Sequence, residues 1–113
     1  MSKIKLINVN DIKNDDMLQV TINGENYLVA KINDKLFVTS DMCTHEDAEL
    51  TMGCLKGTTV KCPLHGSYFD LTSGLALNEP AEDPIRVYKT IIENNILFLY
   101  HQYYTLVNTI ACL

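Results

Sequence analysis

Two short segments, each with one cysteine and one histidine, place the strongest constraint on how this chain can fold. The first contains Cys43-x-His45 and the second contains Cys62-x₂-His65, with residues 46–61 between them. On a regular strand Cys43 and His45 would share one face, whereas Cys62 and His65 would point to opposite faces. Both segments are therefore predicted to be loops bent around a common object.

The chemistry of these side chains indicates a transition-metal site. Thiolate and imidazole ligands select iron, zinc or copper rather than magnesium or calcium. A set of two cysteines and two histidines fits one tetrahedral zinc ion. It also fits a [2Fe–2S] cluster with both thiolates on one iron and both imidazoles on the other. Structural zinc sites usually have two cysteines in one segment and two histidines in the other, whereas each segment here has one cysteine and one histidine. This order favours the [2Fe–2S] cluster, in which two facing loops each provide a ligand to both irons. The number and type of ligands alone do not exclude a zinc ion.

The rest of the sequence predicts an all-β fold, a small antiparallel β-sandwich or barrel. Short apolar segments alternate with Asn, Gly and Asp, and Asn23-Gly24 is a strong hairpin signal. No stretch keeps a period of 3.6 residues, so any helix should be short. The predicted strands cover residues 3–9, 17–22, 27–32, 35–39, 58–62, 67–70, 85–93 and 96–100. We expect one domain over residues 1–100 and an apolar C-terminal tail, residues 101–113, packed on that domain.

Composition and charge exclude several classes of protein. The length of 113 residues corresponds to one domain, and nine basic against 14 acidic residues give a net charge of −5. An acidic chain is a poor candidate for nucleic-acid binding. No run of 18 apolar residues is present, and the N-terminus lacks the apolar region of a signal peptide. We therefore expect a cytoplasmic protein whose cysteines are thiols or metal ligands.

Over roughly residues 3–100 the sequence resembles the Rieske iron–sulfur proteins, most closely the small soluble Rieske-type ferredoxins. The resemblance implies a cluster-binding subdomain of two loops and one Rieske-type [2Fe–2S] cluster held by Cys43, His45, Cys62 and His65. It rests on four motifs: Cys43-x-His45, Cys62-x₂-His65-Gly66, Phe69-Asp70-x-x-Ser73-Gly74 and the proline loop Glu79-Pro80-Ala81.

Departures from the high-potential members of that family predict a low reduction potential. Ala48 and Leu64 stand where those proteins have a disulfide, and Phe69 stands where they have a tyrosine that bonds a cysteine sulfur. Ser67 matches the serine that donates to a bridging sulfide. This chain therefore keeps one potential-raising hydrogen bond and lacks the other.

Acidic residues are concentrated beside the two metal segments. We expect them to form an acidic rim that steers docking to basic partner surfaces. The alternative is an ordinary solvated surface. The third cysteine of this region, Cys54, is expected to be a small apolar filler. The acids in question are Asp41, Glu46, Asp47, Glu49, Glu79, Glu82 and Asp83.

The favoured function is that of an electron carrier without catalytic activity of its own. No nucleophile–base pair, phosphate loop or pair of catalytic carboxylates is recognisable in the sequence. The resemblance implies a flavin- or iron–sulfur-containing reductase as donor and a terminal oxygenase or reductase as acceptor, with no nucleic acid or membrane involved. Alternatives are the small subunit of a nitrite reductase-like complex and, in another class, a Cys₂His₂ zinc interaction module.

Overall fold

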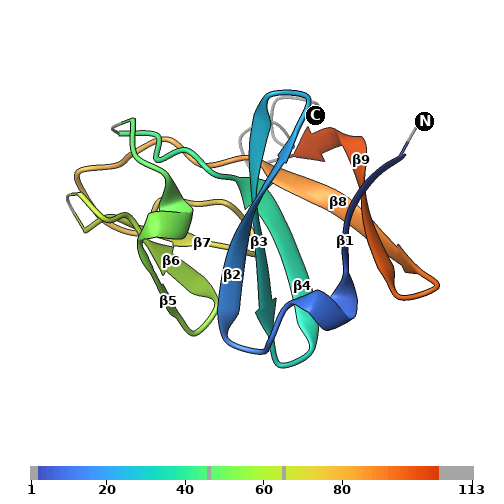
Figure 1. Cartoon of the computed structure of the whole chain (residues 1–113). Helices are drawn as coiled ribbons and strands as arrows, with labels where there is room; N and C mark the ends of the chain where they lie inside the picture. The colour runs from blue at the N-terminus through green and yellow to red at the C-terminus, as the bar shows by residue number, and fades with distance from the viewer. Residues whose placement is uncertain (1–2, 46, 65, 105–113) are drawn as a thin grey trace.

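The computed structural model describes residues 3–45, 47–64 and 66–104, and the regular structure in these ranges is almost entirely β-strand (Figure 1). None of the described segments forms a helix long and apolar enough to cross a membrane. A six-stranded antiparallel sheet has the order β1-β9-β8-β4-β3-β2. The predicted all-β fold is therefore confirmed. Its strands are β1 (Lys3–Asn8), β2 (Asp16–Ile22), β3 (Glu25–Ile32), β4 (Lys35–Ser40), β8 (Val87–Glu93) and β9 (Ile96–Tyr104).

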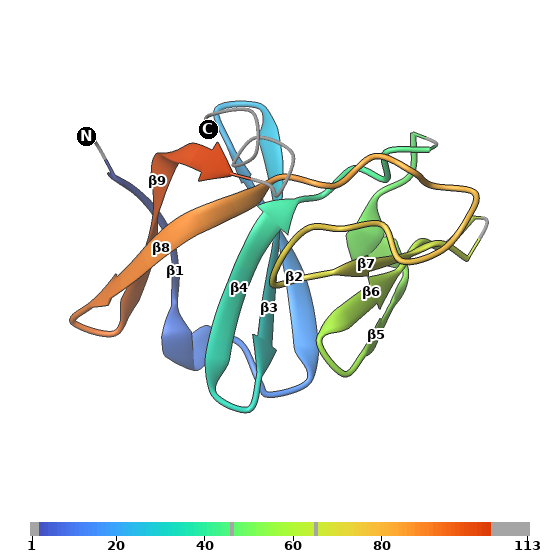
Figure 2. The same ribbon diagram turned by 180° about the vertical axis from the view of Figure 1, so that it is seen from behind.

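A second, three-stranded sheet is inserted in the chain between β4 and β8. It has the order β5-β6-β7 and lies at the end of the molecule opposite β1 and the β8–β9 hairpin, as both views show (Figures 1 and 2). Two short 3-10 turns complete the regular structure of the described ranges, η1 (Val9–Asp11) and η2 (Leu50–Met52). The strands of the small sheet are β5 (Cys54–Lys56), β6 (Thr59–Lys61) and β7 (Tyr68–Asp70).

The hairpin turns of the large sheet follow the sequence signals closely. Asn23 and Gly24 both have positive φ, 52° and 81°, and join β2 to β3 in the register Ile22↔Glu25. Two positive φ angles match the right-handed twist of the flanking strands, which is why Asn-Gly is favoured there. Asn94 and Asn95 make the corresponding turn between β8 and β9, with φ of 51° and 64°.

Two features of the strand pattern differ from the prediction. Strand β5 was not predicted, because three residues are too few to show an alternation. Strand β9 continues past Tyr100, the predicted end of the last strand, to Tyr104, which pairs with Val87 of β8. Of the predicted tail, residues 105–113 lie outside the described residues.

The buried side chains form two clusters, and the candidate metal residues belong to one of them. The cluster under the large sheet contains the edge-to-face pair Tyr27 and Tyr88, with ring centroids 5.2 Å apart. The other cluster lies between the two sheets, and both Cys43 and Cys62 are part of it. Its further members include Leu28, Ala48, Leu50, Val60, Phe69, Leu71, Ala81 and Ile85. The small sheet and the metal segments thus share one core.

Candidate metal centre

The two metal segments are loops that close in the same way. In the first loop, residues 43–48, the Cys43 N–H donates to the Ala48 carbonyl at 2.8 Å. In the second loop, residues 62–67, the Cys62 N–H donates to the Ser67 carbonyl, also at 2.8 Å. Each cysteine therefore opens a loop whose far end returns to its own backbone. This agrees with the prediction that both segments are loops.

Burial separates the thiols from the described imidazole. Cys43 and Cys62 are 3% and 2% exposed and belong to the same buried cluster. His45 lies on the exposed side of the first loop. His65, the fourth candidate ligand, lies outside the described residues. The donor set fits a [2Fe–2S] group with its thiolate side in the core and its imidazole side toward solvent.

A third segment, residues 76–83, ties the two loops together. Thr44 of the first loop donates its hydroxyl to the Asp83 carbonyl at 2.7 Å. From the second loop, the Ser67 hydroxyl oxygen accepts the Ala81 N–H at 3.0 Å. This tying segment contains the predicted proline loop, which fixes the positions of both metal loops relative to each other.

Asn78 is a positioning residue that sequence reasoning missed. Its Oδ1 accepts the Tyr68 N–H at 2.6 Å, and its Nδ2 donates to the carbonyls of Gly66 and Glu79, both at 3.2 Å. One amide side chain thus joins the end of the second loop to the tying segment. No signal in a single sequence distinguishes this asparagine from an ordinary turn residue.

Ser67 is buried where the second loop meets the tying segment. Its side chain is 1% exposed, and its oxygen accepts the bond from Ala81. A hydroxyl that accepts one bond still has its hydrogen to donate. The neighbouring candidate position, Phe69, is fully buried in β7 and offers no donor.

The acidic rim must be corrected at Asp41. Its side chain is only 2% exposed, so this acid does not belong to the surface. The Asp41 carboxylate accepts bonds from the Thr51 backbone N–H and hydroxyl, both at 2.8 Å, and from the Gln19 amide at 2.6 Å. Asp41, two residues before the first loop, therefore links β2 to η2 as a structural residue.

The other acids of the predicted rim differ in exposure. Glu49 is half-buried, and its carboxylate accepts a 2.8 Å bond from Gln19. Glu46 lies outside the described residues. The remaining acids are exposed: Asp47, Glu79, Glu82 and Asp83.

Cys54 also departs from the prediction. It was expected to fill apolar space, yet its side chain is exposed at the start of β5. The alternation of the strand explains this, because the next residue, Leu55, points toward the core instead.

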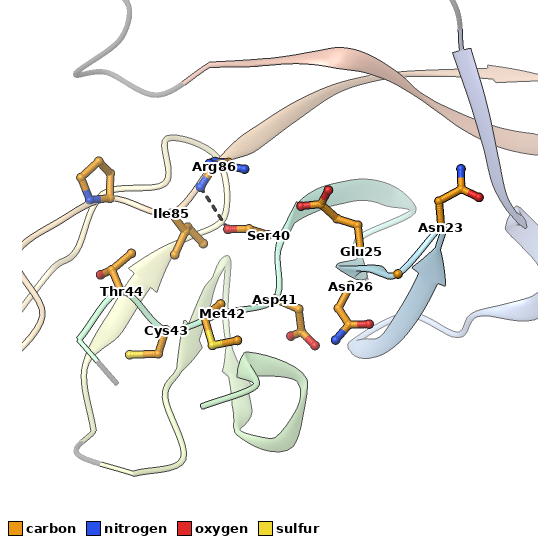
Figure 3. Close-up of a pocket in the computed structure, with 12 residues that line it drawn as sticks. Asn23, Glu25, Asn26, Ser40, Asp41, Met42, Cys43, Thr44, Ile85 and Arg86 are labelled. Carbon is orange, nitrogen blue, oxygen red and sulfur yellow. Dashed lines mark hydrogen bonds between the residues drawn. The ribbon is translucent and has the colours of Figure 1, made fainter. Parts of the chain in front are cut away.

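A pocket of about 590 Å³ lies beside the first loop, between the β2–β3 turn and residues 84–86 (Figure 3). Ser40 and Arg86 meet at its edge, where the Arg86 N–H donates to the Ser40 hydroxyl at 3.2 Å. Cys43 forms part of the wall, and the described lining residues lie in the ranges 23–26, 40–44 and 84–86.

Within the described ranges, no three or more His, Cys, Asp or Glu side chains form a group that could hold a metal ion. His65, the fourth candidate ligand, is not among the side chains of these ranges. The assignment of the four ligands consequently remains a prediction.

Comparison with known proteins agrees with this geometry. Residues 2–89 match the Rieske [2Fe-2S] domain family. The chain is 34% identical over 91 residues to the ferredoxin component of the naphthalene 1,2-dioxygenase system of Pseudomonas putida, covering 80% of this chain and 88% of the relative. It resembles a ferredoxin of Sphingomonas yanoikuyae B1 with a TM-score of 0.84 at 31% identity, covering 89% of this chain and all of the other.

The fold also matches a chain in the complex of reduced oxygenase and oxidized ferredoxin of carbazole 1,9a-dioxygenase, with a TM-score of 0.85 at 24% identity. That match covers 90% of this chain and 95% of the other.

The chain belongs to the Rieske [2Fe-2S] domain family. Its cofactor is a Rieske-type cluster, so the zinc alternative does not hold. The named relatives are ferredoxin components of dioxygenase systems, and this confirms the prediction of an electron carrier that is not itself an enzyme.

Proposed function

We propose that this protein carries single electrons in the cytoplasm, from a flavin- or iron–sulfur-containing reductase to a terminal oxygenase. In this role Cys43 and Cys62 would hold one iron of the cluster, and His45 and His65 would hold the other. The relative from the naphthalene 1,2-dioxygenase system supports the class of partners. The complex of oxygenase and ferredoxin in carbazole 1,9a-dioxygenase supports an oxygenase as the acceptor.

The observation that carries this proposal is the difference in exposure between the thiols and the imidazole. Cys43 and Cys62 are buried in one core, whereas His45 faces solvent. When bound, the cluster accepts and releases one electron. The buried thiolates exclude water from its inner side, and the exposed imidazole edge of His45 gives a partner the shortest approach.

A redox titration tests the carrier role. The holoprotein, reduced with dithionite, is titrated anaerobically with ferricyanide while its visible absorption is followed. We expect one electron per chain and no turnover of an aromatic substrate in the absence of other proteins. A protein that takes up no electron, or that oxidises an aromatic substrate alone, would contradict the proposal.

Replacing Ser67 by alanine is expected to lower the reduction potential by roughly 40 mV, because one donor worth about 1 kcal/mol to the reduced state is lost. The Ala81 N–H also loses its acceptor. The matched control is Ser73→Ala, because the Ser73 hydroxyl likewise accepts a backbone N–H, that of Leu75 at 3.2 Å. Redox titration should show no shift for the control; equal shifts in both variants would reject this role of Ser67.

The Phe69→Tyr variant tests the missing donor from the opposite direction. A hydroxyl added at this buried position should raise the potential by roughly 40 mV. Tyr68→Phe removes a phenol from the half-buried neighbour on the other face of β7 and should leave the potential unchanged. A fall in potential for Phe69→Tyr would contradict the hydrogen-bond explanation of a low potential.

The acidic rim, whose fully exposed described members are Asp47, Glu79, Glu82 and Asp83, predicts a salt effect. Raising the ionic strength from about 10 mM to about 150 mM shortens the Debye length from about 30 Å to about 8 Å. Oxidation of the reduced protein by hexaamminecobalt(III), a cationic stand-in for a basic partner, should slow about tenfold. Oxidation by uncharged dioxygen is the control and should change little. A salt-independent rate with the cation would count against the rim.

A further inference from the structure

The outer face of the three-stranded sheet carries positive charge next to the second loop. Leu55, Val60 and Phe69 point from its strands into the core, so the alternate residues point outward. We call this outward surface the basic face. It comprises Cys54, Lys56, Thr59, Lys61, Tyr68 and Asp70 and, from the adjoining tying segment, Leu77.

The two lysines of the basic face are not neutralised by neighbouring acids. Within the described ranges, the ion pair found is Lys3 with Glu93, so no described carboxylate lies within 4.0 Å of either lysine of the face. The Lys56 and Lys61 ammonium groups each lie 5.9 Å from the centroid of the Tyr68 ring. That distance is at the limit of a cation–π contact, so the charges remain available to a partner.

The acid that belongs to this face, Asp70, is engaged by backbone N–H groups. Asp70 pairs with Thr59 across β6 and β7. Its carboxylate accepts the Thr72 N–H at 2.7 Å and the Ser73 N–H at 3.4 Å, which turns it toward its own loop. With two lysines and one aspartate, the basic face has a net positive charge on a chain whose total is −5.

The basic face adjoins the metal loops. Lys61 directly precedes Cys62, and its Cε would lie 3.4 Å from a Cβ placed on Gly66 of the second loop. A hollow of about 410 Å³ extends from Lys56 to Leu77 and is lined also by Asn78, the residue that holds the Gly66 carbonyl. Leu77 is 51% exposed at its edge. A protein bound to this face would contact the second loop.

We propose that the basic face is a docking surface for an acidic protein surface on one of the two redox partners, opposite in sign to the acidic rim. Charge complementarity selects the partner, since two unpaired ammonium groups favour carboxylates and disfavour other cations. Tyr68 and Leu77 supply the aromatic and apolar contacts that interface centres commonly contain. This inference rests on the proposed function as an electron carrier.

The test compares two charge-reversed double variants of the holoprotein. Lys56→Glu/Lys61→Glu changes the basic face, and Lys5→Glu/Lys89→Glu makes the same change of charge on exposed residues of β1 and β8 (Figure 1). The reduced proteins are oxidised at low ionic strength by ferricyanide, an anionic probe, and by hexaamminecobalt(III). We expect ferricyanide to oxidise the basic-face variant at least fivefold more slowly than the control variant. Hexaamminecobalt(III) should oxidise the basic-face variant no more slowly than the control variant.

Two further measurements connect the face to a carboxylate partner. Lys56→Arg/Lys61→Arg should keep the wild-type rate with ferricyanide, because it keeps the charge. Hexaglutamate should inhibit the oxidation of the wild type by ferricyanide but not that of the basic-face variant. Equal rates in the two charge-reversed variants, or no inhibition of the wild type by hexaglutamate, would overturn the inference. A wild type that takes up no electron would instead refute the proposed function.

Discussion

Replacing Cys62 by serine is expected to leave the chain without its iron and sulfide. Cys62 is 2% exposed and opens the second loop with its N–H bonded to Ser67. A serine hydroxyl is a harder and far less acidic ligand than a thiol, so it cannot supply the soft anionic donor that the inner iron requires. Iron and acid-labile sulfide measured on the purified variant should both fall to background.

The chain offers a matched control for this substitution. Cys54 is a cysteine of the same region whose side chain is exposed in β5. Cys54→Ser makes the same chemical change outside the loops and should retain the full iron and sulfide content. Loss of the cluster in both variants, or its retention in Cys62→Ser, would contradict the assignment of Cys62 as a ligand.

The second large effect is expected at Gly53, which precedes β5 and lies against the end of β6, the strand that leads to Cys62. A Cβ on Gly53 would lie 1.8 Å from the carbonyl oxygen of Lys61. Backbone cannot yield as a flexible side chain can, so Gly53→Ala must push β5 and β6 apart. We expect a loss of about 3 kcal/mol, at the upper end of what overpacking usually costs. The thermal midpoint of the holoprotein should then fall by about 12 °C.

Gly57 in the β5–β6 turn provides a control, because alanine at this position changes the backbone preference without causing a clash. Its φ of 57° disfavours alanine, but no atom lies within 4 Å of where a Cβ would stand. Gly57→Ala should therefore cost about 1 kcal/mol, or about 4 °C. If Gly53→Ala were as stable as Gly57→Ala, the close approach to Lys61 would not be a constraint.

Local sequence signals predicted the large sheet well because its turns are encoded by two adjacent residues. Asn23 and Gly24 adopt the positive φ angles that their side chains permit, and the register of β2 and β3 follows from that turn. Strand β5 gave no comparable signal, since Cys54–Lys56 is a strand only by virtue of pairing with β6.

The candidate site was predictable in its ligand types but not in its supporting contacts. Asp41 stands in an acidic stretch of sequence, yet it is buried because Gln19 and Thr51, both distant along the chain, donate to its carboxylate. Asn78 joins the second loop to the tying segment through bonds that only the tertiary structure creates. Such roles depend on partners that no local pattern specifies.

If two loops hold a pair of bridged irons, with the thiols of Cys43 and Cys62 inward and the imidazoles outward, the protein must contain a [2Fe–2S] cluster. Metal and sulfide analysis combined with EPR of the dithionite-reduced wild type tests it most directly. We predict two irons and two sulfides per chain and an EPR signal that appears only on reduction. A colourless protein that contains zinc and stays EPR-silent after dithionite would contradict the claim.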